Sequence, residues 1–529
     1  MKIKVSHDEV QACPKPNAIG FLSRPTRHLF CNGKGGVGKT SLSAAAALKM
    51  ADAGREVLLV STDAASNLDE MLGVALRNTP APVPGAPGLW VLNIDPRNAA
   101  EAYRQRVLTQ MGAAATETEL STVREQFSGA CTTEIASFDA FAALLSDDAG
   151  HFDHIVFDTA PTGHTTRLLS LPKASSGFLE GNDRGASCLG PHAGLKMQEA
   201  RFKAASEALS DPALTTVVLV TRPDKGAILE AARTSEDLRE LGLTNQRLAI
   251  NGVFHASDRS DAVARAIDDL GQLALAEMPQ SLRELPQDFA PLRAFDTVGL
   301  PALRALLASR TLIVDPARAA PIASAEPVAP IQGLAALADA LAATGYGLIM
   351  VMGQGGVGKT TVAAALALGL IQRGKTVHLS TTDPAAHLAA TLEGEVQGLQ
   401  VSRIDPKVET RRHVDKIMAA RQDPSYTKII LVTLPEATPV SQAAPLQEDL
   451  RRANVEPCAW VLNKSVLAAG TRDPLLAERL AGERRQIERM PAGLTQRLFT
   501  LPWLTVPPIG FAALSKLACN TTTATVVHA

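Results

Sequence analysis

A glycine-rich stretch of eight residues occurs twice in the chain, and it constrains the fold more than any other feature. The copies are Gly33-Lys34-Gly35-Gly36-Val37-Gly38-Lys39-Thr40 and Gly353-Gln354-Gly355-Gly356-Val357-Gly358-Lys359-Thr360. Each fits the phosphate-binding P-loop pattern G-x-x-x-x-G-K-[ST], follows an apolar run and precedes an alanine-rich helical run. This order places a phosphate at a helix N-terminus, where backbone N–H groups and the helix dipole favour an anion. Because both copies have the same context, we expect two nucleotide-binding halves.

Strands and helices alternate along the chain from His28 onward, which predicts an α/β fold. We expect each half to be a doubly wound, mostly parallel sheet. Residues from about 314 to 332 are rich in Ala and Pro without periodicity, which is typical of a linker. The expected segments are an N-terminal extension (1–27), a first P-loop half (28–313), the linker (314–332), a second P-loop half lacking an internal block (333–518) and a tail (519–529).

Composition and charge exclude several classes of protein. The formal net charge is −2, so the chain lacks the excess of basic residues that is typical of nucleic-acid-binding proteins. No run of about twenty apolar residues predicts a membrane span, and the first residues do not form a secretory signal. The six cysteines show no C-x-x-C spacing, which argues against a disulfide framework or structural zinc and favours a reducing cytoplasm.

The two halves match in spacing until one interval. Lys39 to Asp63 is 24 residues, and Lys359 to Asp383 is also 24. Further along, 116 residues separate Pro96 from Pro212, whereas only 18 separate the equivalent Pro406 and Pro424. The second half is therefore shorter by 98 residues, and we expect a deletion there. The missing block would carry the counterparts of Cys131, of residues 158–164 and of Cys188.

The first half supplies the groups that phosphoryl transfer requires, which are mainly positioning and charge-neutralising groups. We expect Lys39 to hold the β/γ-phosphates and the Thr40 hydroxyl to ligate Mg²⁺. Asp158, at a strand end, would hold a Mg²⁺-bound water, and Asp63 would orient or deprotonate the attacking water. Either aspartate could instead be a helix N-cap or turn residue.

The second half offers an incomplete version of this set. Lys359, Thr360 and Asp383 repeat the lysine, the Mg²⁺ ligand and the first aspartate, but no residue repeats Asp158. We expect this half to bind nucleotide better than it hydrolyses it.

Lys34 adds a second lysine directly after the first glycine of its loop, which marks the deviant P-loop class. In that class this lysine crosses the interface and contacts phosphate in the facing site. Gln354 occupies the equivalent position, and a neutral amide neutralises transition-state charge less well.

Three residues of the first half are candidates for a soft-ion site. Cys131 and Cys188 are either thiolate ligands or buried apolar residues, since a thiophilic ion needs two or three thiolates. His164 ends a loop that begins at Asp158, so it either links the nucleotide to a second site or bonds to backbone.

Together these motifs resemble the arsenite-translocating ATPase family, ArsA. The resemblance rests on two deviant P-loops in one chain and covers about residues 25 to 518. It also rests on Asp158-Thr159-Ala160-Pro161-Thr162-Gly163-His164, Cys131-Thr132-Thr133-Glu134 and Ala186-Ser187-Cys188-Leu189-Gly190-Pro191. It implies a P-loop NTPase whose two halves are fused as a pseudo-dimer.

The resemblance also implies an activity and partners. Such a protein hydrolyses ATP with Mg²⁺ when arsenite or antimonite binds, drives the membrane carrier ArsB and receives metalloid from the metallochaperone ArsD. It would be cytoplasmic and peripherally associated with the inner membrane through its partner. Cys131 and Cys188 would be metalloid thiols with His164 nearby, and residues 158–164 a signal-transduction loop.

The same resemblance makes Asn251 and Asn463 the adenine-side asparagines. The residues expected to line the nucleotide sites are Gly33, Gly35, Gly36, Val37, Gly38, Lys39, Thr40, Ser41 and Asn251, and Gly353, Gly355, Gly356, Val357, Gly358, Lys359, Thr360, Thr361, Asp383 and Asn463.

The chain departs from the family in one respect that keeps alternatives open. The family's third metalloid cysteine belongs to the missing block, so the protein is either an impaired pump ATPase or a nucleotide-binding relative with weak catalysis. A targeting factor for tail-anchored membrane proteins shares the deviant P-loop. That class uses a C-x-x-C clasp and a Met-rich groove, whereas this chain has no C-x-x-C and ten methionines.

Overall fold

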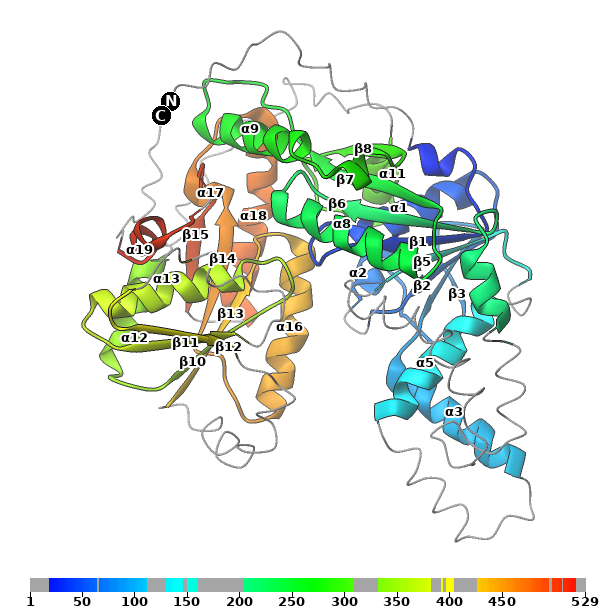
Figure 1. Ribbon diagram of the computed structural model, residues 1–529, viewed down its shortest axis with the longest axis horizontal. Coiled ribbons are helices and arrows are strands. Elements are labelled where there is room, and N and C mark those ends of the chain that lie inside the picture. Colours follow the sequence, from blue (N-terminus) through cyan, green and yellow to red (C-terminus); the bar gives the residue numbers. More distant parts are fainter. Residues whose placement is uncertain are drawn as a thin grey trace.

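The computed structural model contains two α/β halves packed side by side (Figure 1). It describes residues 19–63, 66–111, 130–145, 150–159, 201, 203–308, 332–381, 392, 396–403, 426–493, 497–506 and 508–519. An α/β fold with large, mostly parallel sheets was predicted from the sequence, and the structure confirms it.

The first half is built on an eight-stranded sheet in the order β3-β4-β2-β5-β1-β6-β7-β8. All neighbouring strands are parallel except β3 and β4. The strands are β1 (His28–Asn32), β2 (Val57–Ser61), β3 (Ala81–Pro82), β4 (Leu89–Asn93), β5 (His154–Asp158), β6 (Thr215–Thr221), β7 (Gln246–Val253) and β8 (Gln287–Pro291).

Helices cover both faces of this sheet because side chains of each central strand alternate between two apolar layers. On one face, Leu29 packs with the alanine-rich α1. On the other, Phe30 stacks on Phe157 at 4.4 Å between ring centroids. The helices are η1 (Gly20–Leu22), α1 (Lys39–Asp52), α2 (Leu68–Leu72), α3 (Pro96–Met111), α5 (Ala130–Leu145), α8 (Lys225–Glu240), α9 (Ala262–Ala276), α10 (Gln280–Arg283) and α11 (Leu300–Leu306).

The second half repeats this arrangement with a five-stranded sheet, in the order β10-β13-β14-β15-β9, and a separate two-stranded sheet of β11 and β12. Its strands are β9 (Gln332–Gly333), β10 (Leu348–Met352), β11 (Val377–Thr381), β12 (Leu399–Arg403), β13 (Thr427–Thr433), β14 (Ala459–Ser465) and β15 (Leu498–Pro502). Its helices are α12 (Leu334–Ala343), α13 (Lys359–Gln372), α16 (Ala437–Arg452), α17 (Val466–Ala469), α18 (Pro474–Gly493) and α19 (Phe511–Cys519).

The split of the second sheet has a simple cause. In the first half, β5 lies between β2 and β1 and pairs with both. The second-half equivalents of β2 and β1 are β11 and β10, each 320 residues later in the chain. The described part of the second half holds no strand between them. In the described residues, the second half therefore has no counterpart of the central strand β5.

The halves are joined by hydrogen bonds between polar side chains. Ser257 Oγ donates to Asp473 Oδ2 at 2.7 Å, and Thr471 Oγ1 donates to Asp261 Oδ2 at 2.8 Å. On another part of the interface, Asn67 Nδ2 donates to Thr438 Oγ1 at 3.1 Å.

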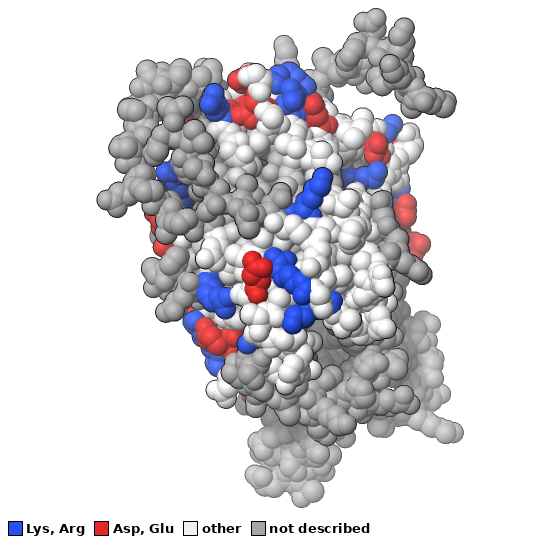
Figure 2. All heavy atoms as spheres, turned by 90° about the vertical axis from the view of Figure 1, so that its left-hand side faces the viewer, with Lys and Arg blue, Asp and Glu red and all other residues white. Residues whose placement is uncertain are grey.

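The surface shows a mixed charge distribution. Among the described residues on the face in Figure 2, basic and acidic side chains are interspersed over a largely uncharged surface. None of the described helices is long and apolar enough to cross a membrane.

A buried histidine at the start of β1 makes stability depend on pH. Burial and the nearby Arg27 guanidinium lower the pKa of His28 from 6.5 to about 4. The unfolded chain therefore takes up a proton near pH 6.5 while the folded chain stays neutral until about pH 4, so the free energy of unfolding falls as the pH drops across this window.

We expect His28→Leu, which introduces the residue found at the equivalent position 348, to reduce this pH dependence. The variant should lose about 1 kcal/mol less stability than the parent between about pH 7 and pH 5.5. Urea unfolding at the two pH values measures this difference, and equal losses in both proteins would contradict a neutral His28.

Candidate functional site: two facing P-loops

The two P-loops meet at the interface between the halves with their backbones in contact. A Cβ atom on Gly35 would lie 3.0 Å from the carbonyl oxygen of Gly355, and one on Gly356 would lie 2.6 Å from that of Gly35. Gly36 and Gly356 also have φ angles of 80° and 81°, which side chains disfavour. Glycine is therefore required here both for loop conformation and for the close approach of the loops.

Each loop ends at a glycine that touches an asparagine of its own half. Gly38 (φ 87°) and Gly358 (φ 91°) directly precede α1 and α13. Asn251 Nδ2 donates to Val37 O at 2.9 Å, and Asn463 Nδ2 donates to Val357 O at 2.9 Å. The asparagines thus fix the last turn of each loop, which sets the direction of the helix N-terminus.

Lys39 occupies a buried position near two carboxylates. Its side chain is 8% exposed, and its Nζ donates to Lys34 O at 3.2 Å. Burial lowers the pKa of Lys39, although the charges of Asp158 and Asp63 oppose this shift. The structure therefore brings together the lysine and both aspartates that the sequence singled out.

Asp158 lies at the carboxyl end of β5 and is almost fully buried. Burial raises its pKa to about 6, and the Lys39 charge and hydrogen bonds with Thr40 and Ser43 offset this effect only in part. Its Oδ1 accepts no hydrogen bond within the described part of the chain. A buried carboxylate oxygen beside a threonine hydroxyl is a donor set that suits Mg²⁺ or its bound water.

The second P-loop lies in a more open setting. Lys359 is half-buried, and its Nζ donates to Gln354 O at 2.5 Å. The strand that would carry an equivalent of Asp158 is absent from the described residues, as noted above. Asp383 lies outside the described residues.

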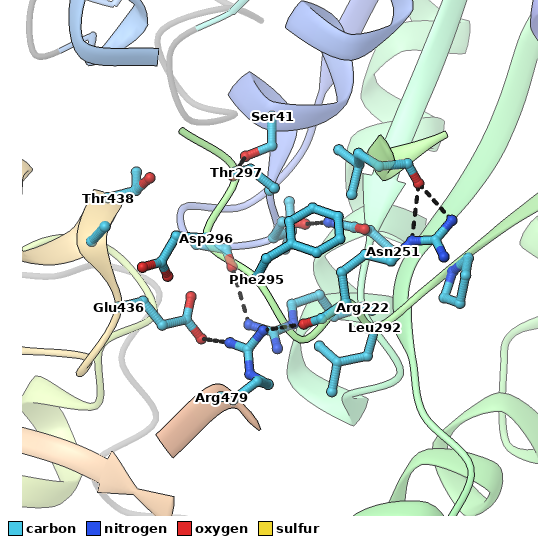
Figure 3. A pocket seen from close by; sticks show the side chains of 18 residues that line it. Ser41, Arg222, Asn251, Leu292, Phe295, Asp296, Thr297, Glu436, Thr438 and Arg479 are labelled. Atoms are coloured by element: carbon cyan, nitrogen blue, oxygen red, sulfur yellow. Dashed lines mark hydrogen bonds and ion pairs between the residues drawn. The ribbon is translucent and has the colours of Figure 1, made fainter. Parts of the chain in front are cut away.

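A cavity beside the first loop is closed by residues of both halves (Figure 3). Arg479 Nη2 pairs with Glu436 Oε1 at 3.1 Å, and its Nη1 donates to Arg293 O at 2.7 Å. Ser41 hydrogen bonds Thr297 at 2.7 Å on the opposite wall. The residues labelled around this cavity are Ser41, Arg222, Asn251, Leu292, Phe295, Asp296, Thr297, Glu436, Thr438 and Arg479.

A second, larger cavity of about 520 Å³ lies beside the second loop. Both loops line it: Lys34, Gly35, Gly36 and Val37 from the first, and Gly356, Gly358 and Thr361 from the second. Lys34 therefore lies at a cavity that both loops share, at the interface between the halves. The volume is within the range of small-molecule sites.

Comparison with known proteins identifies the family of this architecture. The family model for the anion-transporting ATPase matches residues 26–311 and 346–406. The chain belongs to the anion-transporting ATPase family. It is an ATP hydrolase, as the sequence analysis predicted, and the resemblance stated there is confirmed.

Curated members of the anion-transporting ATPase family match most of the chain. The arsenical pump-driving ATPase of Acidiphilium multivorum is 42% identical over 93% of this chain and 98% of its own length. The arsenical pump-driving ATPase of Escherichia coli is 40% identical over 94% of this chain and 99% of its own length. The ATPase GET3B of Arabidopsis thaliana is 30% identical over only 53% of this chain and 77% of its own length.

Several predicted site residues lie beyond what the structure describes. Cys188 and His164 fall outside the described residues, as does Asp383. Cys131 lies near the start of α5, but its side chain is not described. For the metalloid site, the roles assigned to these residues stay predictions.

The sequence analysis missed three charged residues at the interface. Arg222, Glu436 and Arg479 line both cavities. Burial opposes ionisation of Glu436, but the charges of Arg479, Arg222 and Lys464 outweigh it and lower the pKa of Glu436. Arg222 and Glu436 each lie beside a proline just after the carboxyl end of a strand. Functional groups of parallel sheets gather at such ends, so this position could have identified both residues from the sequence.

Proposed function

We propose that this ATPase is the catalytic subunit of an arsenical pump, in which ATP hydrolysis is coupled to extrusion of arsenite or antimonite through a membrane carrier. The similarity to arsenical pump-driving ATPases over 93% of the chain carries this proposal. The facing P-loops support it, because two sites that share one interface allow binding at one to act on the other.

In the first site, the proposed roles follow from the positions of the side chains. Lys39 and the loop amides bind the β/γ-phosphates, and Lys39 holds positive charge close to Asp158 and Asp63. Thr40 and Asp158 would hold Mg²⁺ and its water, and the ion would supply charge neutralisation on the phosphates. Asp63 orients the attacking water. Asp158 is almost fully buried, whereas Asp63 is half-buried and can be reached by water.

We propose that the second site binds nucleotide but contributes little hydrolysis. Lys359 and Thr360 provide phosphate and Mg²⁺ contacts, and Lys34 adds a charge from the facing loop. The absence of a β5 counterpart among the described residues supports this asymmetry. A deletion, in an ancestral second half, of the block equivalent to residues between Pro96 and Pro212 accounts for this difference between the two sites.

For the metalloid, we propose Cys131 and Cys188 as thiolate ligands, with His164 linking them to the nucleotide. The partners would be the carrier ArsB and the metallochaperone ArsD, with the protein in the cytoplasm and peripherally bound to the inner membrane. With two thiols in place of three, metalloid should bind more weakly by at least about tenfold, which corresponds to roughly 1.4 kcal/mol.

A second candidate is a nucleotide-binding module with weak hydrolysis that acts in regulation. The split second sheet favours it, because this feature removes catalytic groups while leaving the loop and helix that bind phosphate.

The test combines hydrolysis with thiol protection. We expect measurable Mg²⁺-dependent ATP hydrolysis, weak stimulation by arsenite, and protection of two thiols from maleimide by arsenite. Replacing Cys131 and Cys188 by serine should abolish protection, whereas Cys458→Ser serves as a control because Cys458 is a half-buried thiol of the second half.

Two outcomes would contradict the proposal. Arsenite binding that persists in the double serine variant would remove these cysteines from the site. Hydrolysis with no response to arsenite and no thiol protection would favour the regulatory module.

A further inference from the structure

The residue that follows the loop-binding asparagine differs between the halves. Asn251 precedes Gly252, and Asn463 precedes Lys464. Both positions lie where a strand shifts its register against its neighbour, β7 against β8 and β14 against β15. The φ angle is 75° at Gly252 and 59° at Lys464, so the backbone makes the same left-handed turn in each half. The two residues are structural equivalents, and the second half has a lysine where the first has a glycine.

Lys464 adopts a backbone conformation that is unusual for its residue type. Within the described part of the chain, Asn454 and Lys464 are the non-glycine residues with a positive φ angle. Asparagine often adopts this region, whereas lysine rarely does, because its Cβ atom crowds the backbone. The glycine at position 252 makes the same turn without that strain. Strain retained at one residue in this way is typical of functional sites.

The Lys464 side chain borders the cavity of about 520 Å³ described above. The lining of this cavity reaches Gly358 and Thr361, at the start of α13. Their first-half counterparts, Gly38 and Ser41, line the smaller cavity. Because backbone N–H groups at a helix N-terminus attract phosphate, Lys464 shares its cavity with the phosphate-binding end of the second half.

Lys34 of the first half borders the same cavity, so two ammonium groups face one space. Neither group makes a hydrogen bond or an ion pair with another described residue. Desolvation by the surrounding protein lowers the pKa of Lys464; the Asp224 charge opposes this shift, and the like charges of Arg222 and Lys34 add to it. Cations that repel each other across a cavity favour an anionic occupant.

An ion pair across the interface accounts less well for Lys464. The carboxylates whose charges act on it are those of Asp224 and Glu436. Asp224 Oδ1 accepts a hydrogen bond from Ala227 N at 3.0 Å and caps α8. Glu436 pairs with Arg479 at 3.1 Å (Figure 3). Both carboxylates therefore have other partners, and among the described residues neither forms an ion pair with Lys464.

The cavity also has an apolar wall beside Lys464. Pro502, Trp503 and Leu504 line it just after the carboxyl end of β15. Trp503 N donates to Ser465 O at 2.9 Å, which holds this wall next to the residue that follows Lys464. An anionic ligand with a flat apolar part fits such a site better than a free phosphate ion does, and a nucleotide has both parts.

We propose that the Lys464 ammonium group binds the phosphate chain of a nucleotide held by the second P-loop and sets the nucleotide affinity of that site. This inference rests on the proposed binding of nucleotide by the second half. A contact that is equally strong before and during hydrolysis raises affinity without raising the rate. Lys464 thus makes the second site one of tight retention, and Gly252 provides no such contact in the first.

Binding of a non-hydrolysable ATP analogue with Mg²⁺ tests this role in a Lys39→Ala background, which is expected to bind nucleotide only at its second site. Lys464→Gly should raise the Kd by about tenfold, the loss typical of one hydrogen bond to a charged group. The affinity of the variant should also depend less on salt concentration. Lys464→Arg should retain most of the affinity. Inorganic triphosphate should lose affinity as the analogue does, which places the contact on the phosphates.

Thermal unfolding of the nucleotide-free protein should change in the opposite direction. Lys464→Gly removes the strained φ angle and the repulsion from Lys34 and Arg222, so the unfolding temperature should rise while affinity falls. Two exposed residues of the same half provide controls. Asn454→Gly replaces the other residue with a positive φ angle, and Lys516→Ala removes a lysine from α19. Both should leave analogue affinity unchanged.

Three results would overturn the inference, and they differ in what else they refute. Unchanged analogue affinity in Lys464→Gly, with Lys359→Ala still abolishing binding, would exclude Lys464 from an intact second site. A fall in both affinity and unfolding temperature would make Lys464 a structural residue. No analogue binding by the Lys39→Ala protein would refute nucleotide binding by the second half, and this inference with it.

Discussion

Lys39→Ala is expected to reduce ATP hydrolysis by on the order of a hundredfold or more and to remove ATP-analogue binding at the first site. The reason is the position of this lysine, which is buried under its own loop beside Asp158 and Asp63. No water or neighbouring side chain replaces a positive charge held there. Lys359→Ala should reduce total hydrolysis far less, because the described residues of the second half include no counterpart of β5 and of Asp158.

The measurements are steady-state hydrolysis and equilibrium binding of a non-hydrolysable ATP analogue. Lys49→Ala is the matched control, since Lys49 is an exposed lysine of the same helix. Unchanged analogue affinity at the first site of a folded Lys39→Ala protein would refute the P-loop assignment. A larger loss of hydrolysis from Lys359→Ala would reverse the proposed asymmetry.

Asp158→Asn should separate stability from activity. Burial raises the pKa of Asp158 to about 6, so the folded chain retains a proton between about pH 4 and pH 6 that the unfolded chain has released. Its contribution to stability is therefore lost as the pH rises through this window. At pH 7.5 the neutral asparagine should raise the unfolding temperature, while hydrolysis falls by about a hundredfold or more.

Asp153→Asn is the control for this experiment, because Asp153 is exposed and precedes the same strand at its opposite end. Asp153→Asn should change neither the unfolding temperature nor the rate of hydrolysis appreciably. Full hydrolysis by Asp158→Asn would exclude this carboxylate from the reaction. A lower unfolding temperature would show that the carboxylate stabilises the buried site instead of destabilising it.

The local parts of the site could be predicted from the sequence because short-range patterns determine them. The glycines of each loop, the helix that follows and the strand end at Asp158 each depend on a few neighbouring residues. The spacing also indicated where the halves differ: 24 residues separate lysine and aspartate in each, whereas 116 residues separate Pro96 from Pro212 and only 18 separate Pro406 from Pro424.

Contacts between the halves could not be predicted in this way. Arg479 donates to Arg293 O only because α18 lies against the first half, and no local pattern marks that packing. From the shorter interval, the sequence predicted only the loss of catalytic groups and not an effect on the sheet. In the described residues the second half also has no counterpart of the central strand β5, and its sheet is divided there.

The divided sheet gives the two nucleotide sites different mechanical supports. In the first half, the strand before the P-loop and the strand leading to Asp63 belong to one continuous plate through β5. In the second half, the ribbon of β11 and β12 leads toward Asp383 but is hydrogen bonded to no strand of the main sheet. We therefore expect strain from nucleotide binding at the first loop to spread across eight strands. In the described residues of the second half, strain at the loop reaches the ribbon through helix packing, mainly that of α13 on β10 and β11.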